Sequence, residues 1–209
     1  MPIDWLTNAV TTLFVIIDPI GLAPIFLAVT QGMSRDERRT VALRSCLTAA
    51  GILTVFALLG GVLLASLGIT LSAFRIAGGL LLFWTAAEMV FERREKRKTN
   101  TAKLAITKDQ VRQVAIFPLA IPLMAGPGAI SATVLLASSE PSIATYGALI
   151  GIIWAILALC FVVFLLADRI DPLLGVTGRA LLGRLLGILL AALSVQFVVD
   201  GILAIAAGN

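Results

Sequence analysis

The stretch that decides the fold runs from residue 13 to residue 26 and reads LFVIIDPIGLAPIF. It places a carboxylate, Asp18, and two prolines, Pro19 and Pro24, inside an otherwise apolar segment long enough to cross a bilayer. Proline lacks an N–H and its ring presses on the carbonyl four residues earlier, so a helix must bend or break there. Broken backbone is tolerated in hydrocarbon only where protein or a wet cavity satisfies the freed groups. The segment therefore predicts a broken membrane helix inside a bundle.

The composition of the whole chain is that of an integral membrane protein. Of 209 residues, 59% are apolar and 13% are charged, whereas soluble domains carry about 25% charged residues. A soluble domain of this size could not hide that much apolar surface. The chain has no histidine and only two cysteines, which lie far apart. A disulfide framework and a Cys/His metal site are therefore excluded, and no cofactor or metal is expected.

Six apolar runs are long enough to be membrane helices, since a span needs about 20 residues. The chain is expected to be one polytopic domain over 1–209, with a first half near 1–92, a basic loop near 93–112 and a second half near 113–209. The expected helices lie near 5–29, 43–67, 72–92, 113–136, 143–167 and 184–206.

The distribution of basic residues predicts the orientation of these spans. All of the 16 lysines and arginines except Arg75 fall on one side of the six expected spans. Lys and Arg collect in cytoplasmic loops, so this side is expected to be cytoplasmic and both termini periplasmic. A basic face of this kind meets lipid headgroups, so membrane lipid is the expected partner and nucleic acid is not.

The two halves resemble each other in sequence. Asp18-Pro19 in the first expected helix and Gly126-Pro127 in the fourth are separated by 108 residues. The runs that start at Arg75 (RIAGGLLL) and at Arg184 (RLLGILLA) are separated by 109. Because each half has three spans, the second half enters the membrane upside down. The sequence thus predicts an all-α protein of six transmembrane helices in a 3+3 inverted repeat, with helices one and four broken by proline and glycine.

Both breaks are expected near the middle of the membrane, by a rise of about 1.5 Å per residue. The segment after each break would then point its N-terminus at the other, and helix N-termini favour anions. Two such N-termini could hold a carboxylate, while Asp18 and freed carbonyls could hold an ammonium, which is the chemistry of an amino-acid zwitterion. The bland alternative, that proline and glycine only kink membrane helices, stays open. The candidate binding residues are Asp18, Pro19, Gly21, Pro24, Gly126, Pro127, Gly128 and Ser131.

Three acidic residues within the expected spans are candidates for proton coupling. Ionisable groups inside a membrane are costly and commonly functional. Asp18 is the deepest, whereas Glu88 and Asp200 lie near span ends, where solvation at the interface explains them equally well. No phosphate-binding Gly-x-x-x-x-Gly-Lys-Ser/Thr loop is found, and no second catalytic group is evident beside Asp18. An enzyme is therefore not expected.

These motifs resemble the MarC family of bacterial inner-membrane proteins, which includes SnatA-type transporters of small neutral amino acids. The resemblance extends over essentially the whole chain. It implies an inner-membrane protein that carries glycine, alanine or similar solutes. Many members carry Asn after the glycine of the first motif, where this chain has Leu22. The motifs that carry the resemblance are 18–21 with 24–26, 75–79, 118–122 with 125–128, and 195–197 with 200–202.

Together these observations predict a secondary transporter, either an exporter or a proton-coupled carrier, of small neutral amino acids. Two alternatives stay open: a channel-like pathway for another small solute, and a membrane partner protein that transports nothing. The expected partners are a small-molecule substrate and lipid. The sequence leaves the oligomeric state open, a homo-oligomer included.

Overall fold

The computed structural model of the chain describes residues 3–91, 115–139 and 141–207, and this part is helical without strands. The predicted basic loop near 93–112 lies outside the described residues. The elements are α1 (Ile3–Ile17), α2 (Pro19–Val29), α3 (Arg35–Ser66), α4 (Leu71–Val90), the π-helix η1 (Ala115–Met124), α7 (Pro127–Ser139), α8 (Ile143–Leu165) and α9 (Ala167–Ala206).

Five segments of the described chain are long and apolar enough to cross a membrane. The predicted run at 113–136 is not among them, because it is divided into η1 and α7, and α7 has only 13 residues. The five segments are Ile3–Val29, Arg35–Ser66, Leu71–Val90, Ile143–Leu165 and Gly183–Ala206. The all-helical membrane architecture is thus confirmed to the extent of about five spans.

Two helices begin earlier than predicted. The second was expected from residue 43 but starts at Arg35, where the Ser34 hydroxyl accepts from the Glu37 N–H and the Glu37 carboxylate accepts from the Ser34 N–H. The last was expected from 184 but α9 starts at Ala167 and is interrupted at Gly175, whose φ is 57°. Hydropathy locates the membrane-buried part of a helix, whereas capping groups set its end, which can lie in polar surroundings.

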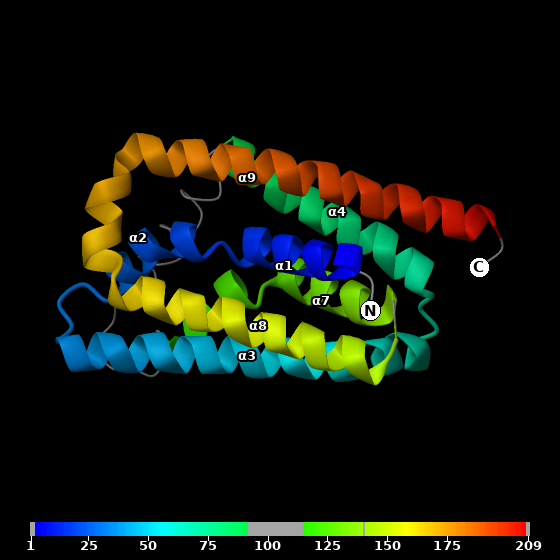
Figure 1. The fold of residues 1–209 in the computed structure, drawn as a ribbon, viewed down its shortest axis with the longest axis horizontal. Helices are drawn as coiled ribbons and strands as arrows, with labels where there is room; N and C mark the ends of the chain where they lie inside the picture. The colour runs from blue at the N-terminus through cyan, green and yellow to red at the C-terminus, as the bar shows by residue number, and fades with distance from the viewer. Residues whose placement is uncertain (1–2, 92–114, 140, 208–209) are drawn as a thin grey trace.

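The broken segments lie between two pairs of continuous helices (Figure 1). One pair is α4 with α9 and the other is α3 with α8. The segments α1 and α2 pack on α8 and α9, while α7 packs on α3 and α4. The rings of Phe26 in α2 and Phe164 in α8 are stacked, with centroids 4.5 Å apart. The two breaks are therefore enclosed by helices on both sides.

Burial confirms that the broken first segment is the innermost part of the bundle. In Ile3–Val29, 67% of the most apolar window is buried, against 22% in Gly183–Ala206. The continuous helices instead expose large apolar side chains, among them Leu59 and Val62 of α3. An apolar exterior around a core that contains the chain breaks is the arrangement expected in lipid.

Each end of the bundle has an interhelical polar contact of its own. At one end, Arg38 of α3 forms an ion pair with Asp168 of α9 at 3.2 Å. At the other, the Trp5 indole N–H lies 3.2 Å from the Ser139 hydroxyl and 3.3 Å from the Leu136 carbonyl. The start of α1 and the end of α9 lie at this second end (Figure 1).

Helices α4 and α9 run antiparallel and touch at three glycines. A Cβ on Gly187 would lie 2.9 Å from the Met89 Cβ, and a Cβ on Gly201 would lie 3.0 Å from the Ser72 carbonyl oxygen. Between them, a Cβ on Gly79 would lie 2.8 Å from the Ser194 carbonyl oxygen. Small residues allow such close backbone approach, which is how helices gain packing energy in lipid.

We therefore predict that Gly79→Ala destabilises the protein by about 1–3 kcal/mol, because the new methyl group must push the two backbones apart. Gly147→Ala is the matched control, since nothing lies within 4 Å of a Cβ at that helical position. The control should be neutral or slightly stabilising, because alanine favours helix more than glycine does. Thermal unfolding of the purified variants in detergent measures both, and equal midpoints would contradict the close contact.

Candidate functional site

The first break is centred on Asp18, which lies between α1 and α2. Its φ of 57° and ψ of 65° place it in the left-handed region, which asparagine and aspartate tolerate better than other non-glycine residues. Its side chain is 8% exposed, and its Oδ1 accepts from the Gly21 N–H at 3.0 Å. The predicted break is thus present, and the carboxylate caps the N-terminus of the next helix.

The capping contact requires glycine at position 21. A Cβ on Gly21 would overlap the Asp18 carboxylate. Pro19 is the first residue of α2, where a missing N–H has no cost, and Pro24 lies within the same short helix. The four residues predicted around this break therefore form one local unit.

The second break follows η1. Its last backbone bond runs from the Ala125 N–H to the Ala120 carbonyl at 2.8 Å, the five-residue spacing of a π-helix. Helix α7 then begins at Pro127, and the Ile130 N–H donates to the Gly126 carbonyl at 3.0 Å. The first break has the equivalent bond 108 residues earlier, from the Leu22 N–H to the Asp18 carbonyl at 3.1 Å.

The structure brings the two breaks side by side. A Cβ on Gly128 would lie 3.8 Å from Cγ2 of Ile16, two residues before Asp18. The same Cβ would lie 3.3 Å from Leu82 and 3.6 Å from the Thr85 hydroxyl, both in α4. Gly128 thus sits where α1, α4 and α7 meet, as expected of paired breaks. The sequence did not single out Thr85 in this role.

The breaks differ in how their helix N-termini are satisfied, and this corrects one expectation. Both N-termini were expected to face a solute, but the N-terminus of α2 is occupied by the carboxylate of Asp18. At the equivalent position of α7 stands Gly126, which has no side chain. Among the described residues, the N–H groups of Gly128 and Ala129 have no hydrogen-bond acceptor.

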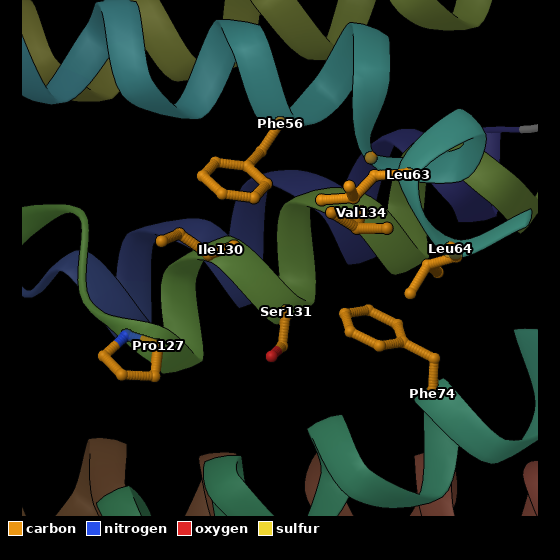
Figure 2. A pocket seen from close by; sticks show the side chains of 9 residues that line it. Phe56, Leu63, Leu64, Phe74, Pro127, Ile130, Ser131 and Val134 are labelled. Carbon is orange, nitrogen blue, oxygen red and sulfur yellow. The ribbon is translucent and has the colours of Figure 1, made fainter. Parts of the chain in front are cut away.

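A cavity of about 290 Å³ opens beside the second break. Figure 2 shows Phe56 and Phe74 pointing into it from α3 and α4, and the Ser131 hydroxyl entering it from α7. Ser131 is only 4% exposed. Of the predicted binding residues, Pro127 and Ser131 line this cavity. The other lining residues are Gly60, Leu63, Leu64, Ile130 and Val134.

The apolar lining residues could not be found from the sequence, because nothing separates Phe56 or Phe74 from other apolar residues of the spans. Their proximity to Ser131 depends on how α3, α4 and α7 pack. The one usable signal is Gly60, four residues after Phe56 on α3, where a Cβ would lie 2.5 Å from Val134.

The remaining acidic candidates have contacts within their own helices. The Glu88 carboxylate accepts from the Trp84 indole N–H at 3.1 Å, and the Asp200 carboxylate accepts from the Gln196 amide at 2.7 Å. Neither lines the cavity. Across the described ranges, no three His, Cys, Asp or Glu side chains are grouped so that they could hold a metal ion.

A family described as "MarC family integral membrane protein" matches residues 3–206. The chain belongs to the MarC family. The match covers both breaks and all the described helices, so the resemblance of the motifs is confirmed. No solved structure matches this MarC family chain.

Relatives of this MarC family chain occur in bacteria and archaea. A UPF0056 membrane protein of Aquifex aeolicus is 37% identical over 197 residues, which is 93% of this chain and 91% of the relative. The UPF0056 membrane protein MJ1677 of Methanocaldococcus jannaschii is 33% identical, over 97% and 98% of the two chains. YhcE of Escherichia coli is 36% identical, over 91% and 88%. Each is named as a membrane protein, and the names state no substrate.

Proposed function

We propose that this protein is a secondary transporter of small neutral amino acids such as glycine and alanine, acting as an exporter or a proton-coupled carrier. The observation that carries the proposal is the pair of adjacent helix breaks, one of which holds the buried Asp18 carboxylate. Ionisable groups and broken helices inside a membrane protein are characteristic of substrate and ion pathways.

We further propose a six-span 3+3 inverted repeat, in which η1 and α7 together make the fourth span. The packing supports it. If α2 corresponds to α7, α3 to α8 and α4 to α9, exchanging the halves converts the contacts of α2 with α8 and α9 into those of α7 with α3 and α4. Such repeats permit alternating access by rocking one half against the other. A bacterial inner membrane with both termini periplasmic is part of this proposal.

The cavity supports a small and largely apolar solute. Its volume of about 290 Å³ is at the lower limit of small-molecule sites, which measure roughly 300–1,000 Å³. Ser131 is the one polar side chain among its lining residues. A solute with a polar or charged side chain would find no partners for it there, whereas a hydrogen or methyl side chain needs none.

The test is counterflow of labelled glycine and alanine in proteoliposomes, comparing the wild type with Asp18→Asn. Asparagine can keep both the left-handed backbone and the cap, so this change removes only the charge. We expect saturable, proton-sensitive exchange by the wild type and a loss of about tenfold or more in the variant, because a hydrogen bond to a charged group is worth about 1.5–3 kcal/mol.

Other outcomes would decide between the alternatives. Saturable exchange that survives in Asp18→Asn would keep the transporter but remove Asp18 from the site. Non-saturable flux without counterflow would indicate a channel-like pathway. A folded, inserted protein with no flux of either amino acid would contradict the proposal and favour a membrane partner protein.

A further inference from the structure

The two helix breaks are built alike except at two positions. In each, a proline begins the helix, and the residue before it accepts a backbone bond from the residue four places on, Leu22 in α2 and Ile130 in α7. The first difference is Asp18 against Gly126, and the second, 108 residues apart like the first, is Ala23 against Ser131. Where α2 carries a carboxylate of its own, α7 carries none and has an added hydroxyl.

The missing carboxylate leaves a defined polar deficit. Asp18 satisfies the Gly21 N–H, the third of α2. The corresponding group in α7 is the N–H of Ala129, a residue 2% exposed, and it has no acceptor among the described residues. Buried backbone N–H groups are nearly always paired. A helix N-terminus also carries about half a positive charge, which favours an anion.

The Ser131 hydroxyl is the second, independent sign of a ligand. It is 96% buried by its 4% exposure, and within the described chain it makes no hydrogen bond. Figure 2 shows it one turn beyond Pro127, directed into the cavity that both residues line. A hydroxyl can accept a hydrogen bond from an ammonium group as well as donate one.

We infer that α7 binds the substrate zwitterion. Its carboxylate takes the place that Asp18 takes on α2 and accepts from the N–H groups of Gly128 and Ala129. Its ammonium donates to the Ser131 hydroxyl, and its small side chain lies in the apolar cavity. The inference rests on the proposed function and assigns the substrate to one break, leaving Asp18 for the cap and the proton.

The test installs the missing carboxylate. In Gly126→Asp the new side chain can cap α7 as Asp18 caps α2, so it should compete with the ligand. Binding of labelled glycine to purified protein, and its displacement by unlabelled acetate, would be measured for the wild type, Gly126→Asp, Gly126→Ala and Ser131→Ala. Acetate probes the carboxylate site alone, since it has no amine.

We expect Gly126→Asp to weaken glycine and acetate about tenfold or more, the scale of a hydrogen bond to a charged group. Gly126→Ala adds a methyl without the charge and should stay within about threefold of the wild type. Ser131→Ala should weaken glycine about tenfold and leave acetate unchanged. The thermal unfolding midpoint of Gly126→Asp should be at least that of Gly126→Ala, because a capped helix is more stable.

Several results would overturn the inference. These are an equal loss in Gly126→Ala and Gly126→Asp, an equal loss of glycine and acetate in Ser131→Ala, and a folded wild type that binds neither probe. Binding and flux separate this inference from the proposed function. Flux that is unchanged in all variants would keep transport and remove the α7 site. Glycine binding that is lost as expected, but without flux in the wild type, would keep the site and remove transport.

Discussion

Asp18→Ala is expected to lose transport and to destabilise the protein by about 2 kcal/mol. Alanine in the left-handed region costs about 1–2 kcal/mol, and the loss of an N-cap costs about 1 kcal/mol. Aspartate already bears part of the first cost, so the two do not add in full. The substitution also removes the carboxylate from the position between α1 and α2 that is enclosed by α8 and α9. Thermal unfolding and counterflow would be measured on the same preparation.

Asp18→Asn separates these two effects, because its amide oxygen can still accept from the Gly21 N–H. Its stability should stay within about 0.5 kcal/mol of the wild type while its transport falls. Gly21→Ala should reproduce the stability loss without changing Asp18, since a Cβ at Gly21 would overlap the carboxylate. An alanine variant at position 18 as stable as the wild type would contradict the capping role.

Trp5→Ala is expected to cost about 3 kcal/mol of stability. The indole is 7% exposed, and its N–H contacts the Leu136 carbonyl and the Ser139 hydroxyl. Removing a buried aromatic side chain leaves a cavity and costs about 3–5 kcal/mol in soluble cores. The lower limit applies here, because lipid tails are as apolar as the pocket that is lost.

Trp84→Ala is the matched control, because Trp84 is 63% exposed on α4. It should change the unfolding free energy by less than about 1 kcal/mol. Trp5→Phe keeps most of the buried volume and loses the donor, so its cost should lie between the two, at about 1 kcal/mol. If Trp5→Ala and Trp84→Ala unfold at the same midpoint, Trp5 does not join α1 to α7.

Sequence reasoning located both breaks because proline acts through covalent geometry. The missing N–H of Pro19 and the preference of aspartate for a left-handed, capping position are local properties, so they hold whatever packs around them. The same locality explains the errors in helix ends. Hydropathy ignored the Ser34 cap, and the helix at Arg35 began before its apolar part.

The roles of the other candidate residues depended on packing. Glu88 and Asp200 were candidates because they are charged within apolar runs, yet each contacts a neighbour on its own helix. The cavity escaped prediction because it is formed by apolar side chains from three helices that lie far apart in sequence.

By itself, the sequence determined that this is a helical membrane protein with two interrupted segments, since composition and proline geometry need no knowledge of neighbours. Only the tertiary structure decided that the interruptions are adjacent, with Gly128 against Ile16, and that they are unequal. The capped N-terminus of α2 and the N-terminus at Gly126 differ in which groups find partners. Hydrogen bonding of buried groups is settled by distances in space, and spacing along the chain does not contain them.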